Sequence, residues 1–142
     1  MKNFNDYHAE ICHVAFLPAS QVALKTKIGQ QDVDVELRGL LVSERPQSAN
    51  FSERRDASGQ FVEQELEAVF TNDEADFVSR FRSLADDDCI VFLEYTNGKR
   101  LVVGTEQAPV RLEYEQSGSP KTLRLSFKRK SPEFAKILKS LT

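Results

Sequence analysis

The sequence has few of the residues that most often carry catalysis. Its 142 residues include two histidines, two cysteines, one methionine and no tryptophan. Both histidines, His8 and His13, lie near the N-terminus, and no glycine-flanked serine elbow is present. Because a serine-type triad needs a histidine within reach of its nucleophile, we predict no catalytic residues. The chain also lacks a Walker glycine loop and a dinucleotide fingerprint, so we predict no cofactor.

The scarce cysteines and histidines give no metal-binding pattern. Cys12 and Cys89 lie in stretches expected to be buried strands, and their wide separation matches no disulfide or metal spacing. His8, Glu10 and Cys12 alternate, so a strand would place His8 and Cys12 about 13 Å apart, too far to chelate one ion. A helix would bring them within one turn, but the residues that follow favour a strand. We therefore predict no metal site.

No apolar run approaches the roughly 20 residues that span a bilayer, so we expect no membrane contact. The N-terminus is polar and lacks the basic start and apolar stretch of a secretory signal. We expect a cytoplasmic protein, or a virion component assembled in the cytoplasm. With 40% hydrophobic and 29% charged residues, the composition is that of a globular chain, and the length fits a single domain over residues 1–142.

What the sequence does have is a strong strand pattern. Apolar and polar residues alternate with a period of two over most of the chain. Asn97-Gly98 predicts a hairpin with a type I′ turn, in which both central residues have positive φ. The polar stretch at 43–60 lacks an apolar period and is predicted to be a mobile loop at the tip of a long hairpin arm. The expected strands are 10–16, 22–28, 33–41, 62–70, 90–95, 101–104, 110–114 and 123–127.

Two segments have helical patterns. Thr71 and Glu74 form a capping box before an apolar face at 77–85. Ser131-Pro132-Glu133 can cap a short C-terminal helix that carries Phe134, Ile137, Leu138 and Leu141. We therefore predict an α+β fold, mainly an antiparallel β sandwich or partly rolled barrel, with one packed helix and a short C-terminal helix.

The charge distribution is uneven. Residues 1–95 hold 9 Lys+Arg against 18 Asp+Glu, and residues 96–142 hold 10 against 4, so the halves carry −9 and +6 and together give −3. If the strands at 33–41 and 62–70 pair, their outward acids gather on one face, and like charges across a ladder destabilise it by roughly 0.2–1 kcal/mol per pair. Two kinds of compensation are open: the basic strand at 124–130 can lie beside these acids within one monomer, or acidic and basic faces can meet between subunits.

The second alternative assigns a set of interface residues for self-association or for contact with other virion proteins. They are Asp34, Glu36, Glu63, Glu65, Glu67, Arg54, Arg55, Arg124, Lys128 and Lys130. The basic members could also contact phosphates, but the nearby Tyr114 and Phe127 fall on apolar faces and offer no exposed stacking platform. Direct nucleic-acid binding is therefore not expected.

The order of elements resembles that of the tail-tube proteins of phages and contractile injection systems. A hairpin arm with a polar tip at 43–60 precedes a helix at 73–85 and further antiparallel strands. The closing sequence LVVGTEQAPVRLEYEQSGSPKTLRLSFKRKSPEFAKIL is similar to the ends of prophage tail-associated proteins. The resemblance implies subunits that form rings, an arm that contacts the next ring, and no catalytic residues. The sequence therefore predicts a non-enzymatic structural or assembly protein, such as a prophage tail component. The alternatives are a stand-alone protein-binding or adaptor domain and a small enzyme of unfamiliar type.

Overall fold

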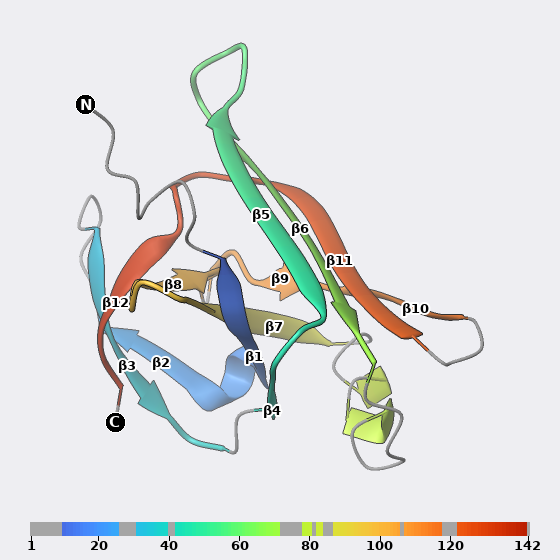
Figure 1. The fold of residues 1–142 in the computed structure, drawn as a ribbon. Helices are drawn as coiled ribbons and strands as arrows, with labels where there is room; N and C mark the ends of the chain where they lie inside the picture. Colours follow the sequence, from blue (N-terminus) through green and yellow to red (C-terminus); the bar gives the residue numbers. More distant parts are fainter. Residues whose placement is uncertain are drawn as a thin grey trace.

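The computed structural model describes residues 10–25, 31–39, 42–71, 78–80, 82–83, 87–105, 107–117 and 122–141. Strands dominate these residues (Figure 1), and one 3-10 turn, η1 (Ala19–Gln21), follows the first of them. The strands are β1 (Ile11–Pro18), β2 (Val22–Lys25), β3 (Asp32–Leu37), β4 (Val42–Glu44), β5 (Ser48–Arg55), β6 (Val62–Phe70), β7 (Asp88–Tyr95), β8 (Arg100–Val103), β9 (Val110–Arg111), β10 (Glu113–Ser117), β11 (Thr122–Ser131) and β12 (Lys136–Leu141).

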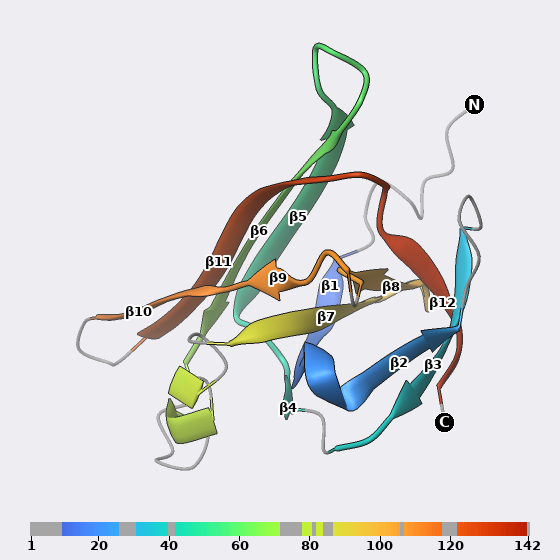
Figure 2. The same ribbon diagram turned by 180° about the vertical axis from the view of Figure 1, so that it is seen from behind.

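The strands form two sheets. An eight-stranded sheet, curled into a half-barrel, has the order β2-β3-β12-β8-β7-β1-β4, with β9 paired to β7. A four-stranded sheet has the order β10-β11-β6-β5. The pairing of β12 with β3 is parallel, and the other ladders are antiparallel. The chain passes directly from β11 in the small sheet to β12 in the large one, and both views show this bend (Figures 1 and 2).

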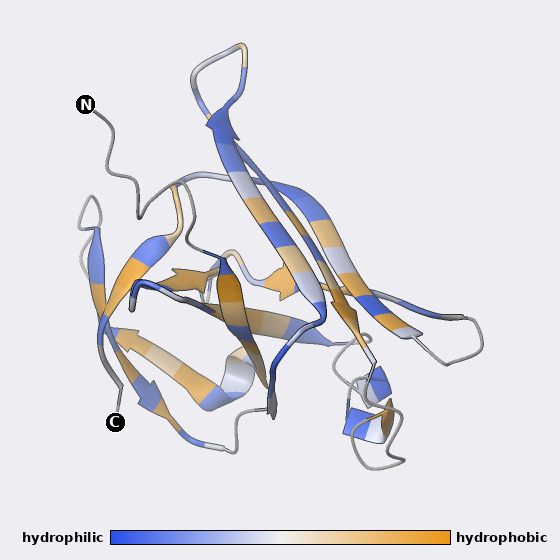
Figure 3. Cartoon of the chain, in the orientation of Figure 1, coloured by the Kyte–Doolittle hydropathy of each residue, from blue (hydrophilic) through white to orange (hydrophobic). Residues whose placement is uncertain are grey.

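Two apolar cores lie on opposite faces of the large sheet. β7 supplies both, because Val91 and Leu93 pack in the cluster that also holds Leu66, Phe70 and Phe127, whereas Ile90 and Phe92 pack in the cluster inside the half-barrel. A strand covered on both faces needs a continuous apolar run, which Cys89 to Leu93 provides. The β6 and β11 strands are covered on one face only, and their hydropathy alternates along the ribbon (Figure 3).

The expected α+β class is wrong, because the described residues are mostly β. The segment expected to be a C-terminal helix is instead strand β12. Lys136 and Leu138 are buried and Ile137 and Lys139 are exposed, which is the period of a strand. The helix expected at 73–85 lies largely outside the described residues, and helical backbone appears at 78–80 and 82–83. No helix in the described part of the chain is long and apolar enough to cross a bilayer.

Two local expectations also change. The segment at 43–60, predicted to be a loop, contains the eight-residue strand β5 and leaves only a short turn before β6. The hairpin at Asn97-Gly98 is present between β7 and β8, but only Gly98 has positive φ, at 89°. Gly98 donates to the Tyr95 carbonyl at 2.9 Å, so a three-residue loop with one left-handed glycine replaces the expected type I′ turn.

Candidate functional site

The β5–β6 hairpin forms an arm whose tip extends beyond both sheets (Figure 1). Its register runs from Ser48 opposite Val69 to Arg55 opposite Val62. The inner face of the arm is apolar near its middle, where Phe51 faces Leu66 and lies 6.4 Å from the Phe127 ring. Toward the tip the outer face of the arm is polar, whereas Val62 on its inner face stays fully buried. On its open side, β5 pairs with no other strand of the described chain, so it is an edge strand.

The tip at 56–61 is held by local hydrogen bonds. Asp56 donates its N–H to the Phe61 carbonyl at 2.9 Å, and its carboxylate accepts the Ser58 hydroxyl at 2.7 Å. The Ser58 hydrogen bond lowers the pKa of Asp56, against a smaller opposing effect of desolvation. Gly59 has a φ of 75°, and its carbonyl accepts from Arg55 at 3.2 Å. Phe61, two residues after Gly59, is 42% exposed and places an aromatic ring on the projecting tip.

The outer face of the small sheet carries most of the predicted interface residues and pairs their charges. Glu65 lies opposite Lys128, and Glu63 lies between Arg54 and Lys130. The Arg54 Nε is 2.8 Å from the Glu63 carboxylate. Farther along, the Arg124 guanidinium is 3.6 Å from the Glu67 carboxylate. Of the two alternatives left open by the sequence, compensation within the monomer is therefore the arrangement seen for these charges.

The other two predicted acids do not join this face. Asp34 and Glu36 lie on β3, in the large sheet, where Glu36 is 3.5 Å from Lys25. The expected pairing of the strands at 33–41 and 62–70 is wrong, because β3 pairs with β2 and β12 while β6 pairs with β5 and β11. The strand that pairs with β6 in place of β3 is β5, which lies in the segment predicted to be a loop.

Arg55 differs from its neighbour Arg54 because its side chain turns toward the β11–β12 connection. Its guanidinium carbon lies 5.2 Å from the centre of the Phe134 ring, within cation–π distance. The Phe134 ring remains 44% exposed. The tip of the arm therefore joins a cation, two partly exposed aromatic rings and an open strand edge in one region.

Below the tip, a row of polar side chains crosses the inner face of the arm. Glu53 lies opposite Gln64, and Gln64 lies opposite Arg129. The Glu53 carboxylate accepts from the Gln64 amide at 2.8 Å and from the backbone N–H of Ala135 at 2.7 Å. Gln64 is 1% exposed, and its Oε1 has no hydrogen-bond partner among the described residues, as is also true of the Arg129 Nη1. Burial lowers the pKa of Arg129.

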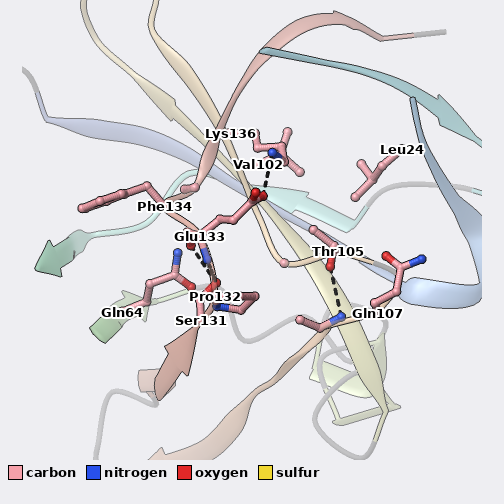
Figure 4. A pocket seen from close by; sticks show the side chains of 13 residues that line it. Leu24, Gln64, Val102, Thr105, Gln107, Ser131, Pro132, Glu133, Phe134 and Lys136 are labelled. Carbon is pink, nitrogen blue, oxygen red and sulfur yellow. Dashed lines mark hydrogen bonds and ion pairs between the residues drawn. The ribbon is translucent and has the colours of Figure 1, made fainter. Parts of the chain in front are cut away.

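A cavity of about 660 Å³ opens beside this row, where β11 passes into β12 (Figure 4). Gln64 lies on one side, the β8–β9 connection at Thr105 and Ala108 on another, and residues 131–136 on a third. Lys136 is 8% exposed at its side chain and is paired with Glu133 at 2.8 Å. The cavity thus combines apolar walls with the Lys136–Glu133 ion pair and the Gln64 side chain at its edge, which suits the binding of a polar group.

Sequence reasoning missed this polar row. Gln64 stands between Val62 and Leu66 on the face of β6 that is otherwise buried, so a polar residue at an apolar position was the available signal. Glu53 gave no such signal, because the whole of 43–60 was predicted to be a loop.

No family model, curated protein or solved structure matches the chain.

Proposed function

We propose that this protein is a non-enzymatic assembly subunit whose β5–β6 arm engages the next copy of the same chain. The observation that carries the proposal is the projection of an ordered hairpin, with an unpaired β5 edge and an exposed Phe61 at its tip, beyond the two sheets. An open strand edge is a template for pairing with another chain. An exposed aromatic ring supplies apolar area for the same contact.

The arm replaces the acidic and basic faces as the main contact in this proposal. The charges of Glu63, Glu65 and Glu67 already face Arg54, Lys128 and Arg124 within the small sheet, so they offer little net field to another subunit. Head-to-tail contact between an arm and a different surface is heterologous, and it closes into rings or continues as stacks. A ring-forming prophage tail subunit fits this geometry.

Shortening the arm tests the proposal. Replacement of residues 56–61 by Asn-Gly joins Arg55 to Val62 through a two-residue hairpin turn and preserves their register. We expect wild-type protein to form higher oligomers as concentration rises, measured by sedimentation velocity and light scattering, with rings visible by negative-stain electron microscopy. The shortened protein should stay monomeric and retain the far-ultraviolet circular dichroism of the wild type.

A matched pair of single substitutions refines the test. Phe61→Ser removes the exposed ring, and Gln60→Ser alters the neighbouring tip residue, which is also exposed but is not apolar. Association should weaken with the first substitution and persist with the second. Unchanged association in the shortened arm would exclude the arm as the contact. A wild type that remains monomeric at its highest soluble concentration would favour the stand-alone binding domain.

The cavity gives the adaptor alternative a specific observation of its own. Gln64 lines a cavity of about 660 Å³, which is large enough to admit a side chain of another protein. An adaptor role predicts that Gln64→Leu abolishes capture of a partner while leaving self-association unchanged. Sedimentation of this variant beside the shortened arm therefore separates the two functions.

A further inference from the structure

An irregularity in β1 brings two neighbouring side chains together on one side of the large sheet. In the β1–β7 ladder Ile11 lies opposite Tyr95 and His13 lies opposite Glu94, so Cys12 is an extra residue with no partner in the register. Consecutive residues of a regular strand point to opposite faces, but a bulge redirects them. As a result one ligand atom from each of Cys12, His13 and Glu94 lies within 4.8 Å of the other two.

The distance between His13 and Glu94 suits a shared cation. Their Nδ1 and Oε2 atoms are 3.4 Å apart. Two ligands about 2.1 Å from a tetrahedral ion are separated by about 3.4 Å. The His13 Nδ1 is shielded from solvent and has no hydrogen-bond partner among the described residues, although the carboxylate is close. An ion between the two side chains would satisfy this nitrogen.

The chemistry of the three ligands selects a class of metal. A thiolate, an imidazole and a carboxylate are all ligands of Zn²⁺, whereas Mg²⁺ and Ca²⁺ prefer oxygen alone. Together the thiolate and the carboxylate supply two negative charges, which a divalent ion balances. Cys12 is partly exposed, and the His13 and Glu94 side chains are 44% and 46% exposed. His13 and Glu94 border a surface hollow of about 150 Å³ that can hold a fourth, exchangeable ligand.

We propose that Cys12, His13 and Glu94 form a three-ligand site for a divalent transition-metal ion, Zn²⁺ foremost, at the β1 bulge. The fourth position of a tetrahedral ion is open to water. Such an ion ties β1 to β7 near one end of their ladder. The inference is independent of the arm and of self-association. His8, which sequence reasoning considered as a ligand partner of Cys12, lies outside the described residues.

Cobalt substitution tests the site. Protein without a histidine tag, kept reduced by a phosphine, is titrated with Co²⁺. We expect saturation at one equivalent, a thiolate-to-cobalt charge-transfer band in the near ultraviolet, and the intense visible bands of tetrahedral cobalt. Zn²⁺ should displace the colour. Absence of a charge-transfer band at excess Co²⁺ in folded wild-type protein would overturn the proposal.

Variants identify the ligands. Cys12→Ser should lose the charge-transfer band, and His13→Gln and Glu94→Gln should each weaken binding by at least about tenfold, the range seen when even an outer-shell partner is removed. Cys89→Ala is the matched control, because Cys89 is a buried thiol on β7 and should leave the spectrum unchanged. Persistence of the band in Cys12→Ser, or its loss in Cys89→Ala, contradicts the assignment.

X-ray absorption at the zinc edge of the wild type gives a measurement that needs no variant. The expected shell has one sulfur at about 2.3 Å and the remaining ligands, nitrogen or oxygen, at about 2.0–2.1 Å. A shell of nitrogen and oxygen alone excludes Cys12 as a ligand and refutes the site as proposed.

Discussion

The substitution Glu63→Lys tests whether the charges on the small sheet stabilise the monomer. Glu63 is flanked by two cations, with the Arg54 Nε at 2.8 Å on one side and Lys130 opposite it on the other strand. A lysine at this position converts two attractive cross-strand pairs into two repulsive ones. Each cross-strand charge pair contributes roughly 0.2–1 kcal/mol.

The magnitude follows from the exposure of the partners. The Arg54 side chain is 81% exposed, so solvent screening places each pair in the lower half of that range. The loss of two attractions and the gain of two repulsions together cost about 1–2 kcal/mol. For a chain of this size, the melting temperature should fall by about 3–8 °C, because 1 kcal/mol corresponds to a few degrees.

Thermal melts and sedimentation velocity should be measured on four proteins: wild type, Glu63→Lys, the double variant Glu63→Lys with Arg54→Glu, which reverses the 2.8 Å ion pair, and Glu113→Lys. The double variant should recover about half of the lost stability, because one of the two pairs is attractive again. Glu113 lies opposite the neutral Ser126, so its substitution should change stability by less than about 0.5 kcal/mol. An unchanged melting temperature combined with altered oligomeric state would show that these charges act between subunits, and the reasoning would be refuted.

Three further predictions follow from the packing. In urea denaturation, Gly104→Ala should destabilise the fold more than Gly59→Ala. Both glycines have positive φ, which costs roughly 1–2 kcal/mol for alanine. A Cβ at Gly104 would also meet Val110 at 3.1 Å, whereas a Cβ at Gly59 would meet open space. Leu66→Ala should cost about 2–5 kcal/mol, because this side chain is fully buried in the core under the arm. The outward-facing Val69→Ala should cost clearly less in the same assay. Burial, followed by the nearby Asp87 and Asp88, raises the pKa of the Cys89 thiol to about 12. A thiol reagent at neutral pH should therefore label only Cys12 in the folded chain and both cysteines in denaturant. Because the unfolded thiol releases its proton near pH 9, the Cys89 contribution should lower stability as pH rises from 9 toward 12, and Cys89→Ala should remove this slope.

The sequence by itself determined the strands whose two faces differ in polarity. In β6 and β11, apolar residues at every second position can be buried only by a strand, and the structure confirms both. The apolar run at Ile90–Leu93 likewise predicted a buried strand. The hairpin at Asn97-Gly98 followed from the backbone freedom of glycine, which is a local property. The acids of β6 and the basic residues of β11 were also visible in the sequence, and their pairing within one monomer was one of the two alternatives that the sequence left open.

Tertiary structure decided the elements whose own pattern was ambiguous. Ile137, Leu138 and Leu141 fit one face of a helix, but the parallel ladder with β3 made the segment a strand. β5 has only Ala49 and Phe51 as inward apolar residues, so its own sequence does not predict a strand. Its pairing with β6 makes it one. Cys12 and His13 share a side only because the β1–β7 register slips by one residue. For β12 and β1 the deciding hydrogen bonds join residues far apart in the chain, so no local window of sequence contains them. β5 pairs with the strand that follows it, but its own polar sequence gives no strand period.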